Sequence, residues 1–256
     1  MTRPQLLIFD VNETLSDLAP MAQRFTDVGA PGDLAEAWFA STLRDGFALS
    51  VVGENPEFAA LARDAARTVL APVSLTLDLG AAVNHVMAGF TELRTHPDVA
   101  EGVAALADLG IRLVTLSNGA TGVAEKLLTD AGLRDRFERL LSVADAPAWK
   151  PAAVAYRYAL NTCGVEASDA MLVAVHPWDL DGAARTGLRT AWVDRGAAPY
   201  PRSFTEPEVR ATRAGPDAGR VHLPRGSGGW APPGGSARRS EPHPERASPS
   251  GSWRCA

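Results

Sequence analysis

Five short apolar runs, separated by segments with helical patterns, constrain the fold of this chain more than any other feature. The runs are rich in Leu, Ile and Val, as expected of strands that are buried on both faces. The alternation predicts a parallel sheet covered by helices on both sides, an α/β, Rossmann-like core. The predicted strands are residues 5–9, 112–117, 139–143, 171–175 and 189–193, and the predicted helices are residues 98–109, 120–131, 151–163 and 180–187.

One connection interrupts this alternation. Residues 18–94, between the first two predicted strands, have helical patterns throughout and are far too many for a loop. Ligands of open α/β sheets bind at the carboxyl ends of the strands, and the segment leaves the first strand at that end. We therefore predict a catalytic core of residues 1–16 and 95–205, with an inserted helical cap of residues 17–94 over its binding edge.

The composition changes near the C-terminus. Residues 211–256 are rich in Gly, Pro, Ser and Arg, contain no lysine and have no hydrophobic periodicity. This composition is typical of a disordered segment, and an out-of-frame translation of GC-rich DNA would leave the same signature. We predict a disordered tail over residues 206–256.

Charge and hydropathy exclude several classes of function. The formal net charge of −5 argues against a general nucleic-acid-binding protein. No apolar run reaches the roughly 20 residues of a membrane-spanning helix. The first ten residues lack the pattern of a secretory signal, and two cysteines form no disulfide framework. We expect a cytoplasmic protein without nucleic-acid or membrane partners, and leave a homodimer open.

Polar side chains follow four of the predicted strands at the point where each strand ends. Because the carboxyl ends of parallel strands meet at one edge of a sheet, these side chains can share a site. The chain has only two lysines, so the lysine in this set suggests a need for a compact ammonium group. The set contains Asp10, Glu13, Thr14, Ser117, Asn118, Lys150, His176, Trp178 and Asp179.

Taken singly, several of these residues have a purely structural interpretation. Asp10 could be a buried acid paired with Lys150, and Thr14 and Ser117 could cap turns. A lone histidine such as His176 is also more often structural than catalytic. The joint arrangement is what favours a functional site.

Four motifs in this arrangement resemble those of the haloacid dehalogenase superfamily. They are FDVNETL (9–15), LVTLSNGA (113–120), WKPAAVAY (149–156) and HPWDLDGAARTGLRTAWV (176–193), and the likeness covers about residues 1–205. The resemblance implies that Asp10 is a nucleophile, that Thr14 and Ser117 position it by hydrogen bonds, and that Lys150 keeps its carboxylate ionised.

Two positions distinguish dehalogenases from phosphatases within that superfamily. Phosphatases there have an acid–base aspartate and a magnesium-binding aspartate where this chain has Asn12 and Val175. The resemblance is therefore closest to the type II (S)-2-haloacid dehalogenases, which need no metal and no other cofactor. Tyr156 matches a tyrosine of that group and is a candidate to contact the substrate, and Asp179 is expected to pair with Lys150 or Tyr156. A phosphatase or phosphonatase-like hydrolase and an inactive homologue are the alternatives.

Two departures from the better-known dehalogenases indicate how an ester on Asp10 would be hydrolysed. Glu13 stands where glycine is common, and His176 belongs to the segment that replaces a Ser-x-Asn element. The pair resembles the His–Glu dyad of a dehalogenase subgroup. We expect His176, oriented by Glu13, to activate the attacking water.

The substrate implied by the resemblance is a small halogenated carboxylic acid, with fluoroacetate left open. Ser117 and Asn118 are candidates to bind its carboxylate, and Trp178 is a candidate to contact its alkyl group. Arg44, in the predicted cap, is our candidate for the departing halide. The alternative for Arg44 is a solvated helix residue paired with an acid such as Asp45.

Overall fold

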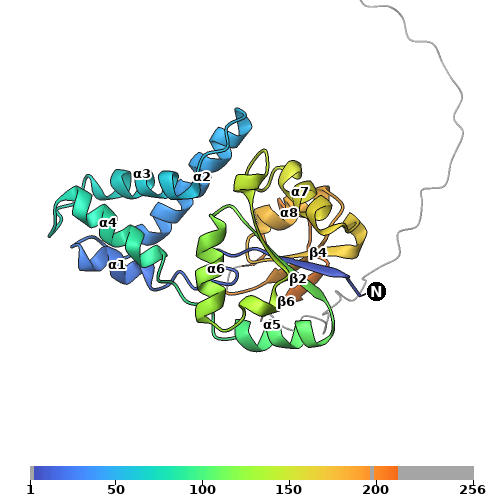
Figure 1. The fold of residues 1–256 in the computed structure, drawn as a ribbon. Helices are drawn as coiled ribbons and strands as arrows, with labels where there is room; N and C mark the ends of the chain where they lie inside the picture. Colours follow the sequence, from blue (N-terminus) through green and yellow to red (C-terminus); the bar gives the residue numbers. More distant parts are fainter. Residues whose placement is uncertain (1–2, 197–198, 213–256) are drawn as a thin grey trace, which may run out of the picture. The chain divides into compact units, whose positions relative to one another are not determined.

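The computed structural model describes residues 3–196 and 199–212, and it contains a six-stranded parallel sheet (Figure 1). The order of the strands is β3-β2-β1-β4-β5-β6, and every neighbouring pair is parallel. The five predicted strands lie within one residue of their expected bounds, so the α/β fold class is confirmed. The strands are β1 (Leu6–Phe9), β2 (Arg112–Ser117), β3 (Arg139–Ser142), β4 (Ala170–Ala174), β5 (Arg189–Val193) and β6 (Val209–Ala211).

The sixth strand corrects the predicted boundary between core and tail. Strand β6 pairs with β5 through Ala191 and Val209, so the core continues past residue 205. Only three residues form this edge strand, which is too short for an alternating pattern to stand out. The predicted tail from residue 213 onward lies outside the described residues.

Helices cover both faces of the sheet. The side chains of each strand point alternately to the two faces, so each strand contributes to two apolar clusters. Leu6 and Ile8 of β1 join the apolar cluster that includes α7 and α8, whereas Leu7 and Phe9 join the cluster of α5 and α6. These four helices are α5 (Val99–Asp108), α6 (Thr121–Asp130), α7 (Ala153–Cys163) and α8 (Pro177–Arg185).

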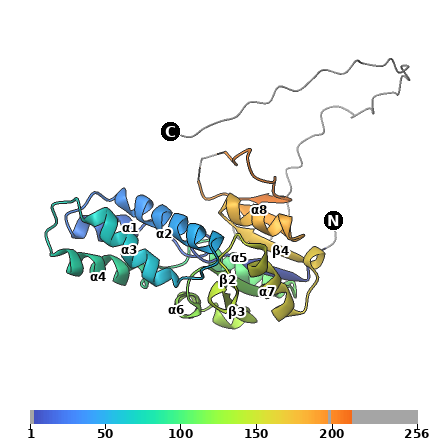
Figure 2. The same ribbon diagram turned by 90° about the horizontal axis from the view of Figure 1, so that it is seen from above.

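The insert between β1 and β2 is helical, in agreement with the predicted cap. Its helices are side by side in Figure 2, and the chain leaves and re-enters the core where Asp17 N donates to the carbonyl of Arg94 at 2.8 Å. An isolated bridge between Ser16 and Thr95 closes the same junction. The four helices are α1 (Met21–Asp27), α2 (Leu34–Val51), α3 (Phe58–Leu70) and α4 (Leu79–Phe90).

The strand order places a topological switch between β1 and β4. The chain connects β1 toward β2 on one side of the sheet, and β4 toward β5 on the other. In open α/β sheets a crevice forms beyond the strand ends at such a point. Asp10 and His176 follow the two strands that flank it. Over the described residues, no helix has the length and apolar character needed to cross a membrane.

Candidate active site

Asp10 lies at the carboxyl end of β1 and is only 4% exposed. Its Oδ1 accepts a hydrogen bond from Lys150 Nζ at 2.8 Å, and its Oδ2 accepts one from Thr14 Oγ1 at 2.7 Å. Burial disfavours the charged carboxylate, but the positive charges of Lys150 and His176 and these hydrogen bonds outweigh it, so the pKa of Asp10 is lowered. The site therefore holds a buried, ionised carboxylate.

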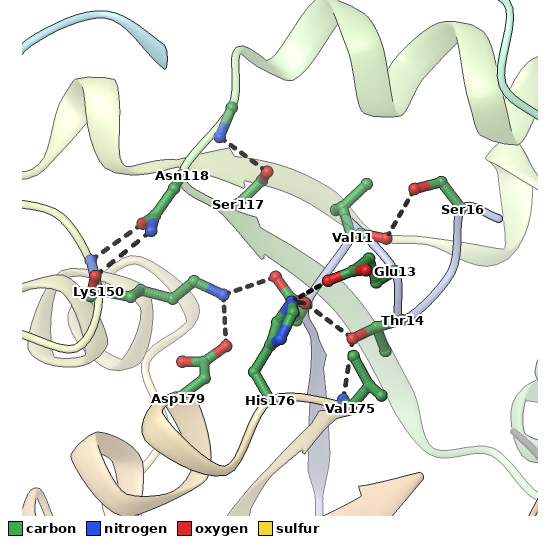
Figure 3. Close-up of polar contacts among 12 residues, drawn as sticks. Val11, Glu13, Thr14, Ser16, Ser117, Asn118, Lys150, Val175, His176 and Asp179 are labelled. Carbon is green, nitrogen blue, oxygen red and sulfur yellow. Dashed lines mark hydrogen bonds and ion pairs between the residues drawn. The ribbon is translucent and has the colours of Figure 1, made fainter. Parts of the chain in front are cut away.

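Lys150 bridges two buried carboxylates. Its Nζ lies 2.8 Å from Asp10 Oδ1 and 2.6 Å from Asp179 Oδ2. Figure 3 shows the Lys150 side chain reaching Asp179. Burial lowers the pKa of an ammonium, but the two carboxylates reverse this effect and raise the pKa of Lys150. The ammonium is thus a permanent positive charge beside Asp10.

Asp179 and Tyr156 fix the far side of this bridge. The Tyr156 hydroxyl donates to Asp179 Oδ1, 2.6 Å away, and both side chains are fully buried. A side chain at Gly182 would approach the Tyr156 hydroxyl to 2.7 Å, so a glycine leaves room for it. Tyr156 orients Asp179 in this arrangement. The hydroxyl is fully buried, and a direct contact of Tyr156 with the substrate stays a prediction.

Thr14 links the ends of the two central strands. Its hydroxyl donates to Asp10 and accepts a hydrogen bond from the backbone N–H of Val175 at 3.0 Å. The hydroxyl is fully committed by these two bonds and is buried. Thr14 therefore aims Asp10, as expected, and has no remaining hydrogen for a substrate.

Ser117 and Asn118, at the end of β2, have different partners. Ser117 Oγ accepts the N–H of Gly119 at 2.9 Å, which leaves the hydroxyl hydrogen available to a ligand. The Asn118 amide instead bonds the main chain of Lys150, with Nδ2 3.3 Å from its carbonyl and Oδ1 3.0 Å from its N–H. The side chain of Asn118 thus holds the backbone of Lys150, and a contact of Asn118 with the substrate stays a prediction.

Glu13 and His176 face each other beside Asp10 (Figure 3). His176 Nε2 lies 3.5 Å from Glu13 Oε2 and 3.7 Å from Asp10 Oδ2. Glu13 has a φ of 60°, the only positive φ of a non-glycine residue in the described chain. That conformation costs a glutamate on the order of 1–3 kcal/mol. Burial raises the pKa of Glu13, although the charge of His176 opposes the shift.

Aromatic rings from the core and the cap enclose His176. The rings of Trp178 and Phe39 are nearly parallel to the imidazole, with centroids 4.9 Å and 6.3 Å away. Phe47 meets Trp178 edge-on at 4.9 Å. Phe39 and Phe47 belong to α2, so the cap supplies part of the wall of the site. Trp178, the candidate for contact with the alkyl group of a substrate, lies among these rings.

Arg44, in α2, has an acidic neighbour as its partner. Its guanidinium binds the carboxylate of Asp45 through two hydrogen bonds of 2.7 and 3.1 Å, and the side chain is 67% exposed. This arrangement matches the alternative of a solvated helix residue paired with Asp45, and the halide contact of Arg44 stays a prediction. The helical pattern alone could not decide which side of α2 faces the core.

Contacts around Trp149 attach the cap to the core next to Lys150. The indole Nε1 donates to the carbonyl of Pro56 at 2.9 Å, and Asn55 donates to the carbonyls of Val143 and Ala146. A Cβ on Gly46 would lie 2.2 Å from the indole ring, so α2 packs directly on it. The same loop that places Lys150 thus positions the cap.

In the described part of the chain, no three His, Cys, Asp or Glu side chains lie together in a way that could hold a metal ion. The polar atoms nearest Asp10 belong to Lys150, Thr14 and His176. The chemistry available here is covalent attack by a carboxylate, followed by base-assisted hydrolysis.

Alignments with two relatives cover most of this chain. It is 27% identical to haloacetate dehalogenase H-2 of Moraxella sp. (strain B) over 198 residues, which cover 76% of this chain and 88% of that protein. It is also 27% identical to an (S)-2-haloacid dehalogenase of Pseudomonas sp. (strain YL) over 210 residues, 80% of this chain and 89% of the relative.

The fold has solved counterparts. The structure of the L-2-haloacid dehalogenase from Xanthobacter autotrophicus matches with a TM-score of 0.75 at 23% identity, over 85% of this chain and 97% of that one. The family model of haloacid dehalogenase-like hydrolases matches residues 4–187, which include the first three motifs and the fourth as far as Gly187. The resemblance inferred from the motifs is confirmed, and the chain belongs to the haloacid dehalogenase-like hydrolases.

Proposed function

We propose that this hydrolase is a dehalogenase that converts (S)-2-haloalkanoates, including haloacetates, into 2-hydroxyalkanoates. One observation carries the proposal: a buried, ionised Asp10 carboxylate has a histidine–glutamate pair at its second oxygen. The named activities of the Moraxella and Pseudomonas relatives support it. A cytoplasmic location and a homodimer stay predictions.

The first step is a displacement at the carbon that bears the halogen. The Asp10 carboxylate attacks that carbon from the side opposite the halogen, and the carbon–halogen electron pair leaves with the halide. An ester forms between Asp10 and the substrate, and the configuration at the carbon inverts. Lys150 keeps the nucleophile ionised, and Thr14 holds its orientation.

The second step is hydrolysis of that ester. Water attacks the carbonyl carbon of the Asp10 ester while His176 accepts one proton of the water. The oxygen that joined Asp10 to the substrate takes up a proton from His176 and leaves as the hydroxyl of the product. The second proton of the water passes to solvent as Asp10 returns to its carboxylate. Glu13 stabilises the protonated His176, and a general base of this kind contributes about 10²–10⁴-fold.

Substrate binding uses the same strand ends. The Ser117 hydroxyl, whose hydrogen is free to donate, is the candidate for the substrate carboxylate. Trp178 and Phe39 offer ring surfaces to the alkyl group. Because Arg44 binds Asp45 in the structure, the positive edges of these rings are further candidates for contact with the departing halide.

Ion chromatography tests the proposal. The protein is incubated with (S)-2-chloropropionate, chloroacetate or fluoroacetate in the presence of EDTA, and halide is measured for wild type and Asp10→Asn. We expect halide from the wild type, none from the variant and no effect of EDTA. Magnesium-dependent hydrolysis of phosphate esters, with no halide release, would instead establish the phosphatase alternative.

A further inference from the structure

The backbone of Glu13 needs an explanation that the Glu13–His176 pair does not supply. The residue adopts a left-handed conformation that an L side chain rarely takes, and its side chain is 41% exposed. A partly exposed ion pair of 3.5 Å is not strong enough by itself to hold a strained backbone. Strained conformations persist only where the surroundings over-determine them. Something other than His176 must hold the loop.

Two side chains from distant parts of the chain bind the carbonyls of this loop. His96 Nε2 lies 3.0 Å from the carbonyl oxygen of Glu13. Arg195 donates from Nε and Nη2 to the carbonyl oxygen of Thr14, at 3.1 and 2.8 Å. His96 lies just before α5 and Arg195 just after β5, so side chains from two separate segments bind the loop.

His96 and Arg195 are themselves held in place by further contacts. Arg195 Nη1 forms an ion pair with Asp98 at 2.9 Å, and the two side chains are 13% and 18% exposed. The backbone N–H of His96 donates to the carbonyl of Leu15 at 3.0 Å, which keeps this segment against the loop. Burial and the nearby charge of Arg195 lower the pKa of His96, in keeping with a neutral ring whose Nε2–H donates to the carbonyl.

We propose that His96, assisted by Arg195, is a positioning residue that fixes the left-handed backbone of Glu13 and thereby aims its carboxylate at His176. This inference rests on the proposed function, and it concerns only the hydrolysis of the ester. The attack by Asp10 depends on Lys150 and Thr14 and does not need the Glu13 carboxylate. Loss of the His96 hydrogen bond therefore slows the second step and spares the first.

The test compares substitutions at one position. His96→Phe keeps an aromatic ring and removes the N–H donor, whereas His96→Gln keeps a donor. His85→Phe is the matched control, because His85 pairs with Asp27 in the cap, away from this loop. Each protein is mixed with (S)-2-chloropropionate, and the halide burst, the steady-state rate and the mass of the protein are recorded.

For His96→Phe we expect a full burst, a steady-state rate reduced about 10- to 100-fold, and accumulation of the ester on the protein. His96→Gln should recover most of the rate, and His85→Phe should match wild type. In a Glu13→Gln background, His96→Phe should add little further loss, because residues that act as one unit are not additive.

Three results would overturn the inference: wild-type turnover in His96→Phe, loss of its halide burst, or an undiminished effect of His96→Phe in the Glu13→Gln background. If His96→Phe does not fold, His96→Leu replaces it in the same cycle, since it also removes the N–H donor and is smaller than a phenyl ring. A wild-type protein that releases no halide refutes the proposed function itself, and this inference with it.

Discussion

Lys150 and Asp179 form an ion pair of 2.6 Å in which neither side chain is more than 1% exposed. Removing Lys150 would leave Asp10 and Asp179 buried without their shared cation. We expect Lys150→Met, which keeps a similar volume, to lower the free energy of unfolding by about 3–5 kcal/mol.

Asp179→Asn is the matched comparison for Lys150→Met. Burial raises the pKa of Asp179, so a neutral amide there relieves a desolvation cost while Lys150 keeps Asp10 as a partner. We expect a smaller loss of unfolding free energy than for Lys150→Met, measured by urea denaturation. An equal or larger loss would mean that Asp179, rather than Lys150, is the centre of this charged cluster.

His176→Ala should separate the two chemical steps. Asp10, Thr14 and Lys150 remain in place, so one equivalent of halide should appear for each protein molecule. Turnover should then fall about 10²–10⁴-fold, because no base activates the water. Intact-protein mass spectrometry should detect the ester. Normal turnover in His176→Ala would rule out the dyad.

The protonation of Glu13 should be visible as a difference between two pH profiles. Burial raises the pKa of Glu13 above its ordinary 4.5, whereas the pKa of Asp10 is lowered, so on acidification Glu13 takes up its proton before Asp10 does. The ratio of kcat for wild type to kcat for Glu13→Gln should be largest near neutral pH. It should approach one as the pH falls, with its midpoint above 4.5. A ratio independent of pH would contradict an ionised Glu13 in catalysis.

Gly46→Ala tests how the cap is seated. A new Cβ would lie 2.2 Å from the ring of Trp149, so α2 must shift, and we expect a loss of about 1–3 kcal/mol in stability. Halide release should fall as well, because α2 carries Phe39. Gly122→Ala, in α6, is the control: nothing lies within 4 Å of its new Cβ, and thermal melting should show no loss. Equal melting temperatures for the two variants would argue against tight packing at Trp149.

Most of the fold could be predicted because its signals are local. Buried parallel strands have continuous apolar runs, and the residues from Met21 to Phe90 have helical patterns between capping and turn residues. Strand β6 could not be found this way, since Val209 to Ala211 is too short and is recognised only by its pairing with β5. Helix α8 starts at Pro177, three residues before the predicted start at 180, because a proline fits the first turn.

The site could be predicted only where position on a strand decides proximity. Asp10, Lys150 and His176 meet because they follow strands of one parallel sheet. The partners of Asn118, Tyr156 and Arg44 depend on how loops and helices pack, which no motif records. His96 and Arg195 lie outside every motif. The one available signal was Glu13 itself, since a position where glycine is common suggests a left-handed backbone that needs support.

In the proposed mechanism Asp10 forms an ester with the substrate, and isotope labelling tests for this ester directly. Excess protein reacts once with (S)-2-chloropropionate in water enriched in ¹⁸O, and both the product and the peptide that contains Asp10 are analysed by mass spectrometry. We predict the label in the carboxylate of Asp10 and unlabelled oxygen in the 2-hydroxypropionate. Label in the product, with none in the Asp10 peptide, would mean that water displaces the halide directly and that no ester forms on Asp10.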